Sequence, residues 1–200
     1  MTPFNSPPSK TEIADLDEYA GLPLERIFVV TDEAQADRAA SEIMNAKIVG
    51  FDTESKPTFF KGQKSSGPHV LQFATADRAF IFQSHVATSQ PAIISLLESD
   101  LLTKVGFGLK GDLRQIASRF GIHPKGIVDL DRSFRHLGYK DVIGVRSAIA
   151  ILFNRNLRKS KSISTTDWSA RHLSDRQLIY AANDAFAALE VYHALKERPA

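Results

Sequence analysis

Short apolar runs alternate with segments of helical periodicity along most of this chain. The apolar runs, which are typical of buried strands, are 27–30, 47–51, 70–74, 79–82, 105–108 and 127–130. The segments with helical spacing or helix end signals are 32–45, 109–120, 142–153 and 174–197, and a further helix begins at Pro91. Segment 154–169 is polar, basic and irregular. This order predicts an α/β domain with a mixed sheet and helices on its faces.

The second apolar run ends in two acidic residues, Asp52 and Glu54, separated by Thr53. Residues two apart in a strand point to the same face, so these carboxylates should lie side by side. Two adjacent carboxylates repel each other, and a divalent cation with a preference for oxygen ligands, Mg²⁺ or Mn²⁺, would remove that repulsion. Taken alone, the pattern is more often a solvated turn after a strand.

Two later segments carry further acids. Asp112 lies in the first turn of the predicted helix 109–120, where an acid also favours the helix dipole. Tyr180 and Asp184 are four residues apart, so they share one helix face. Alanines surround them, and small side chains would let this helix approach the sheet closely. Alone, Asp112 is typical of a helix cap and the Tyr180–Asp184 pair of an amphipathic helix.

Together and in this order, D-x-E, G-x-G-x-x-G-D and Y-x-x-x-D resemble the DEDD-type 3'-5' exonucleases. Because a tyrosine lies four residues before the last acid, the chain resembles the subclass that includes ribonuclease D and the Werner-type exonuclease domain. Other matching segments are Gly50-Phe51, Leu71-Gln72, Lys104-Val105-Gly106, Trp168 and Leu173-Ser174. The resemblance covers about residues 27–195. It implies a ribonuclease-H-like fold with a central mixed five-stranded sheet flanked by helices.

The resemblance also implies a role for each residue in two-metal phosphodiester hydrolysis with Mg²⁺ or Mn²⁺. Asp52 would bridge both ions, and Glu54 and Asp184 would complete the site of the ion that binds the nucleophile. Asp112 would hold waters of the second ion, and Tyr180 would orient the attacking water. The implied substrate is the 3' end of a single-stranded nucleic acid, with DNA and RNA both open.

Two basic segments are candidates for contacting the substrate backbone, because lysine and arginine bind phosphates without reading sequence. The candidate phosphate contacts are Lys56, Lys61, Lys64, Arg158, Lys159 and Lys161. Phe107 could stack on a terminal base, although a core position suits it better.

The sequence leaves two alternative functions open. The turn Gly106-Phe107-Gly108-Leu109-Lys110-Gly111 matches the dinucleotide-binding fingerprint, and Asp129 follows at the usual distance of its acidic partner. That interpretation leaves the D-x-E and Y-x-x-x-D patterns without a role. A catalytically inactive nucleic-acid-binding module is the second alternative.

Composition adds only broad limits. The chain has a net charge of +2 and no cysteine, so disulfides and thiolate chemistry are excluded. The polar, proline-rich start does not resemble a secretory signal, and no apolar stretch is long enough for a membrane span. We therefore expect a cytoplasmic protein without membrane contact, with oligomeric state open. Residues 1–24 are expected to be a flexible lead-in and residues 25–200 the exonuclease domain.

Overall fold

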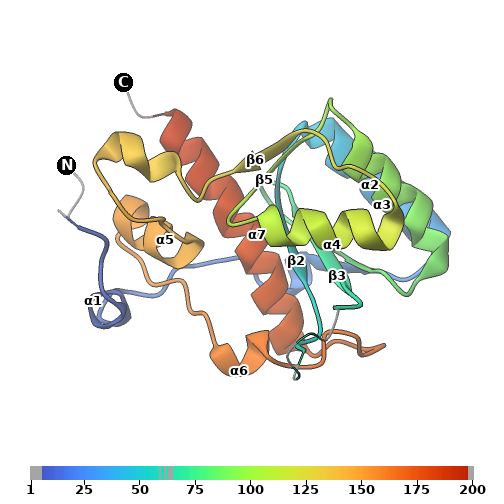
Figure 1. The fold of residues 1–200 in the computed structure, drawn as a ribbon, viewed down its shortest axis with the longest axis horizontal. Helices are drawn as coiled ribbons and strands as arrows, with labels where there is room; N and C mark the ends of the chain where they lie inside the picture. Colours follow the sequence, from blue (N-terminus) through green and yellow to red (C-terminus); the bar gives the residue numbers. More distant parts are fainter. Residues whose placement is uncertain (1–5, 59, 61, 63–64, 198–200) are drawn as a thin grey trace.

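A mixed sheet of six strands in the order β1-β4-β3-β2-β5-β6 forms the centre of the computed structural model (Figure 1). The structure describes residues 6–58, 60, 62 and 65–197. The strands are β1 (Ile27–Val30), β2 (Ile48–Glu54), β3 (Val70–Ala74), β4 (Ala79–Gln83), β5 (Thr103–Gly106) and β6 (Ile127–Asp129). The sheet is mixed because β3 runs antiparallel to both of its neighbours, whereas the other pairs are parallel.

The expected count of five strands is wrong, and the ribonuclease-H-like fold class is confirmed. Both ends of the sheet are extended by short strands: β1 pairs along β4, and the three-residue β6 pairs along β5. Pairing of these short segments depends on neighbours distant in sequence. Strands β3 and β4 form a hairpin, since Ala74 and Ala79 are partners in their antiparallel pair.

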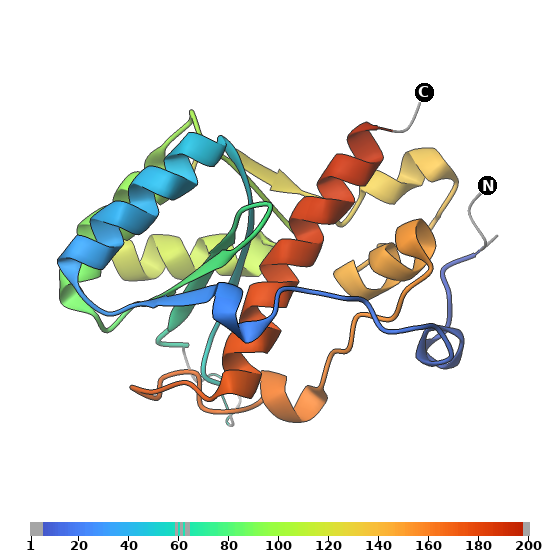
Figure 2. The ribbon, with the colours of Figure 1, turned by 180° about the vertical axis from the view of Figure 1, so that it is seen from behind.

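Helices cover both faces of the sheet. One face packs against α2 (Glu33–Ala46), α3 (Gln90–Glu98) and α4 (Lys110–Phe120). The opposite face packs against α7 (Asp175–Lys196), which crosses the molecule between the sheet and α5 (Val145–Phe153) (Figures 1 and 2). The remaining short helices are α1 (Lys10–Ala14), α6 (Lys161–Ser164), η1 (Leu24–Arg26), η2 (Ala87–Ser89) and η3 (Ser133–Leu137).

The helix end signals in the sequence are confirmed at several positions. Asp32 accepts a hydrogen bond from the Gln35 backbone and caps α2. Gly121 ends α4 in the left-handed conformation that glycine tolerates best. Ser174 and Gln177 form a capping box at the start of α7, which agrees with the predicted start of this helix. Segment 154–169, expected to be irregular, contains the short helix α6.

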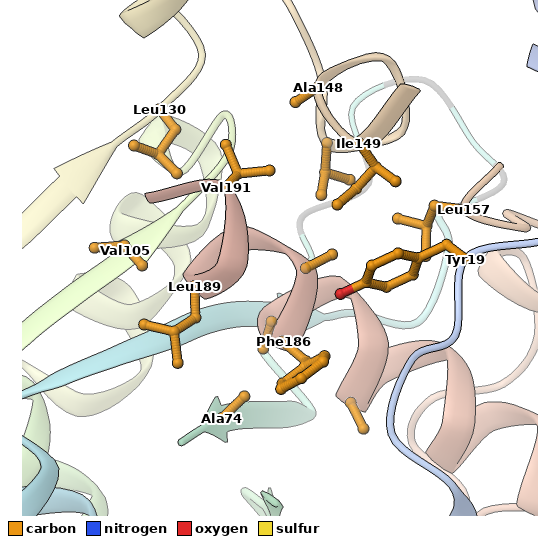
Figure 3. Close-up of a cluster of buried hydrophobic side chains, with 14 of the residues drawn as sticks. Tyr19, Ala74, Val105, Leu130, Ala148, Ile149, Leu157, Phe186, Leu189 and Val191 are labelled. Atoms are coloured by element: carbon orange, nitrogen blue, oxygen red, sulfur yellow. The ribbon is translucent and has the colours of Figure 1, made fainter. Parts of the chain in front are cut away.

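Helix α7 lies unusually close to strand β2. A Cβ atom at Gly50 would lie 1.8 Å from the Ala185 carbonyl oxygen, so only glycine fits between the two backbones. The sheet-facing side of α7 is rich in alanine, as the sequence indicated. In Figure 3 the α7 side chains Phe186, Leu189 and Val191 lie in the core between sheet residues and residues of the α5 region. This close packing brings Asp184 to the sheet.

Residues 6–24 pack against α7 and the segment after α5. The Tyr19 hydroxyl donates to Glu190 at 2.6 Å, and the Leu22 backbone donates to Asn183 at 2.7 Å. Ile13, Tyr19 and Leu22 are buried. These contacts describe position and not motion, so the flexibility of the lead-in stays a prediction. The position of its contacts on α7 nevertheless places the lead-in beside the acidic residues of that helix.

Within the described residues, no helix combines the length and apolar character that crossing a membrane requires.

Candidate active site

Three of the four predicted acids meet at one place. Asp52 and Glu54 lie at the end of β2, where alternation along the strand puts both side chains on the face covered by α7. Asp184 approaches them from α7. One carboxylate oxygen from each of the three residues lies within 4.8 Å of the others. Segments 130 residues apart in sequence therefore build one oxygen-lined cluster.

The surroundings of these three carboxyl groups favour the neutral, protonated form. Burial raises the pKa of Asp52, and the nearby Asp184 and Asp112 carboxylates raise it further. Burial and the charges of Asp52 and Asp184 raise the pKa of Glu54 to about 9. Burial also raises the pKa of Asp184. A divalent cation would reverse these shifts, and a set of carboxylate oxygens suits the hard cations Mg²⁺ and Mn²⁺. The residues present therefore fit a divalent metal centre.

Lys159 places a positive charge directly on this cluster. Its ammonium nitrogen lies 2.8 Å from Asp184 Oδ2, and its side chain is 31% exposed. Burial opposes the charge on Lys159, but Asp184, Tyr180 and Asp52 outweigh it, and the pKa of the ammonium is raised. The sequence indicated a phosphate contact for this residue, whereas the structure pairs it with an acid of the cluster. No periodic pattern in segment 154–169 signals this position.

Tyr180 lies one turn before Asp184 on α7 and is half-buried. Its ring centroid is 6.0 Å from that of Trp168, and the Lys159 ammonium lies 5.6 Å from the ring centre. Burial and the Asp184 charge raise the pKa of its phenol. The hydroxyl therefore keeps its proton at neutral pH and can both donate and accept a hydrogen bond.

Asp112 lies at the edge of the cluster rather than within the group of three. Its Oδ1 accepts a hydrogen bond from the Thr53 hydroxyl at 2.5 Å, and burial raises its pKa. Its charge is nevertheless among those that raise the pKa of Asp52, so it lies near enough to influence that carboxyl group. Thr53, the middle residue of D-x-E, thus links β2 to the first turn of α4.

Besides Lys159, two of the predicted phosphate contacts take part in ion pairs. Lys56 lies 3.3 Å from Asp167, and Arg158 lies 3.2 Å from Glu18, with all four side chains largely exposed. Exposed ion pairs of this kind are weak, so the Lys56 and Arg158 side chains can leave them and contact a ligand.

The other predicted contacts differ in position. Lys161 is exposed at the start of α6. Phe107 is half-buried and packs against the core beneath α7, which agrees with the core position preferred from the sequence. The predicted contacts Lys61 and Lys64 lie outside the described residues.

A cavity of about 350 Å³ opens beside the acids. Its wall includes Tyr19, Arg158, Ser160, Arg176, Tyr180 and Asp184. A hollow of about 440 Å³ between β1 and α2 includes none of the cluster acids. The cavity beside Asp184 therefore combines a volume in the small-ligand range with carboxylates and arginines.

The glycine turn before α4 has a structural explanation. Asp129, the last residue of β6, accepts hydrogen bonds from the Gly108 and Leu109 backbone nitrogens, each at 2.8 Å. Gly108 adopts a positive φ of 65°. In a dinucleotide-binding turn such amides would face the pyrophosphate. Here the Asp129 carboxylate takes that place, so the dinucleotide interpretation of the turn is wrong.

The mixed sheet, with acids at the end of β2 and a Y-x-x-x-D helix across it, defines the ribonuclease-H-like class of domains. The solved Nibbler exonuclease domain of Aedes aegypti aligns with 90% of this chain and 92% of its own, at a TM-score of 0.74 and 21% identity. Ribonuclease D of Trypanosoma brucei aligns with 88% of this chain and 66% of its own, at a TM-score of 0.77 and 19% identity.

The sequence comparison identifies the family, whereas the fold shows only the class of domain. Residues 27–199 match the family model described as 3'-5' exonuclease, and the chain belongs to that family. A 3'-5' exonuclease of Arabidopsis thaliana is 32% identical over 76% of this chain and 54% of its own length. Ribonuclease D of Acidiphilium cryptum is 28% identical over 87% of this chain and 43% of its own length. The chain thus spans about half the length of these curated relatives.

Proposed function

We propose that this domain is a metal-dependent 3'-5' exonuclease that removes nucleotides from the 3' end of single-stranded nucleic acid. The observation that carries the proposal is the convergence of Asp52, Glu54 and Asp184 within 4.8 Å, beside Tyr180. Family membership supports the reaction class. The donor set supports two divalent cations, Mg²⁺ or Mn²⁺, as cofactors.

The four acids would divide the work of holding the cations. Asp52 would serve both cations, Glu54 and Asp184 would help to hold one of them, and Asp112 would order waters of the other. When bound, the cations supply the Lewis acidity that activates the attacking water and stabilises the leaving 3' oxygen. Tyr180 keeps its phenolic proton and orients the attacking water through a hydrogen bond.

Basic residues beside the acids would bind the substrate. The cavity next to Tyr180 receives the terminal nucleotide, and its arginines Arg158 and Arg176 lie where the adjoining phosphates would pass. Lys159 has to exchange Asp184 for a phosphate or for solvent when cations enter, because its ammonium lies against a proposed metal ligand. Lys56 and Lys161 extend the basic surface, and Lys61 and Lys64 are proposed from the sequence alone.

The relatives support a nucleic-acid substrate and differ in their printed descriptions. One solved structure of Trypanosoma brucei ribonuclease D is a complex with the RNA U12. A mouse relative, 26% identical over 76% of this chain and 11% of its own length, is a bifunctional 3'-5' exonuclease and ATP-dependent helicase. We therefore propose that both RNA and DNA be tested as substrates.

Digestion of 5'-labelled single-stranded RNA and DNA tests the proposal. With Mn²⁺ or Mg²⁺ we expect a ladder of products shortened one nucleotide at a time, and EDTA should abolish it. A ladder that persists in EDTA would contradict the metal mechanism. Binding of either oligomer without shortening under any metal condition would favour the inactive-module alternative.

A further inference from the structure

The side chain of Gln72 is a buried polar group without a partner, at the centre of the sheet. Gln72 is fully buried, and neither its amide oxygen nor its amide nitrogen has a hydrogen-bond partner in the structure. A buried amide without a hydrogen-bond partner destabilises the folded state, because it has lost its hydrogen bonds to water and gained none in return. Such a group in a folded protein calls for a functional explanation, because an apolar residue of similar size would be more stable there.

The register of the sheet places this amide beside the metal centre. Gln72 is the residue directly opposite Asp52 in the antiparallel pair of β2 and β3. Directly opposite residues put their side chains on the same face, with Cβ atoms about 4.5–5.5 Å apart. Val70 and Ala74, two residues to either side of Gln72, pack in the core beneath α7. Gln72 therefore points to the α7 face, as Asp52 does.

The neighbours of Gln72 on this face leave few polar partners. Its partner on the other side, in β4, is the apolar Ile81. The next pair along the strands, Gly50 with Ala74, is covered directly by the Ala185 backbone of α7. Asp52 is thus the charged side chain that lies opposite the amide across the strand pair.

We propose that Gln72 is a positioning residue that donates its amide N–H to the Asp52 carboxylate when the metal centre is loaded. This inference rests on the proposed function. A carboxylate shared between two cations must hold both oxygens in fixed directions, and a carboxylate has lone pairs left for a further donor. Hydrogen-bond partners behind metal ligands fix the orientation of those ligands.

The chemistry of an amide suits this position better than that of a charged donor. Gln72 is neutral, so it can hold Asp52 without lowering the negative charge that attracts the cations. Lys159 supplies a positive charge to the same cluster, at Asp184. The two residues would therefore act differently: Lys159 balances charge without metal, and Gln72 orders Asp52 with metal.

The test compares Gln72→Met with the wild-type protein. Methionine has nearly the same length and shape but cannot donate a hydrogen bond, and Gln72→Leu serves as a second apolar variant. Without metal, we expect both variants to unfold at the same temperature as wild-type or higher, because an unpaired amide is removed. Mn²⁺ affinity, measured by isothermal titration calorimetry, should fall about 10-fold or more in both variants.

Ser84→Ala is the matched control. Its hydroxyl is also buried and unpartnered, at a position just after β4 that contributes nothing to the cluster. We expect the control to bind Mn²⁺ as wild-type does. Unchanged Mn²⁺ affinity in Gln72→Met, or an equal loss in Ser84→Ala, would overturn the positioning role while leaving the proposed function intact. Absence of Mn²⁺ binding in the wild-type protein would overturn both.

Discussion

The Tyr180 ring is held by contacts that do not involve its hydroxyl. It packs near Trp168 and the Lys159 ammonium, and phenylalanine would keep both contacts. Tyr180→Phe should therefore fold normally and bind Mn²⁺ as tightly as wild-type. Its turnover should fall about 100-fold, because the attacking water loses the group that orients it. Single-turnover digestion of a labelled oligomer measures this, and unchanged turnover would remove Tyr180 from the mechanism.

Lys159 balances the charge of the acids in the absence of metal. In Lys159→Met, Asp184 loses its cationic partner, and the free energy of unfolding measured in EDTA should fall. Because the lysine side chain is partly exposed, we expect a loss of about 1–2 kcal/mol, below that of a fully buried pair. Saturating Mn²⁺ should remove most of the difference, since the cation replaces the lysine charge.

Urea unfolding with and without Mn²⁺ measures the Lys159 effect. An equal loss of stability under both conditions would show that the lysine contributes packing rather than charge. Arg38→Met, on the exposed surface of α2, serves as a control, because it removes the same positive charge at a distance from the cluster.

At the scale of elements, the contact between β2 and α7 determines whether the acids meet. Gly50→Ala would place a methyl group 1.8 Å from the Ala185 carbonyl oxygen, next to Asp184. The helix would have to move away from the sheet, so we expect a loss of about 3 kcal/mol or more. Gly111→Ala in α4 is the matched control, because a Cβ there meets nothing within 4 Å.

Urea denaturation of both glycine variants provides the comparison. The control should be neutral or more stable by about 0.5–1 kcal/mol, since alanine suits a helix better than glycine. If Gly50→Ala were as stable as Gly111→Ala, the close approach of α7 to β2 would be contradicted.

Lys104 stabilises the end of α3 from strand β5. Its buried side-chain nitrogen donates to the Leu96 and Ser99 carbonyl oxygens at 2.9 and 2.8 Å. Burial lowers its pKa from 10.5 to about 8, although Asp100 opposes the shift. The unfolded chain therefore binds more protons than the folded one between these values, and this residue's contribution to stability rises as pH increases from about 8 to 10.5.

The variant Lys104→Met isolates this pH dependence. The difference in unfolding free energy between wild-type and Lys104→Met should change in favour of wild-type as pH rises from 8 to 10. Urea unfolding at several pH values measures it. A difference that stays constant over this range would mean that Lys104 has an ordinary pKa in the folded protein.

At the scale of the whole molecule, the parts that the sequence predicted well are those with local signals. Alternation along a strand predicted that Asp52 and Glu54 share a face, and a capping box marked the start of α7. The run of alanines around Asp184 predicted the close approach of this helix to the sheet. These features depend on neighbours in sequence, so a pattern of a few residues carries them.

The features that the sequence did not predict depend on contacts between distant segments. The Lys159 ammonium reaches Asp184 from an irregular segment, and Asp129 receives the α4 backbone amides from the end of another strand. All six apolar runs pair into one sheet, one strand more than the resemblance implied, and their order in that sheet depends on contacts of the same kind. The resemblance includes Leu71-Gln72, but the position of Gln72 opposite Asp52 follows from strand register alone.

Titration of the metal-free protein with Mn²⁺ in a calorimeter shows whether the converging carboxylates form a metal centre. Wild-type and Asp37→Asn, which alters an exposed acid on α2, should bind Mn²⁺ with equal affinity. Asp52→Asn should fold and lose most of that affinity, because the carboxylate proposed to serve both ions is gone. Equal Mn²⁺ binding by all three proteins, or none by wild-type, would contradict the account.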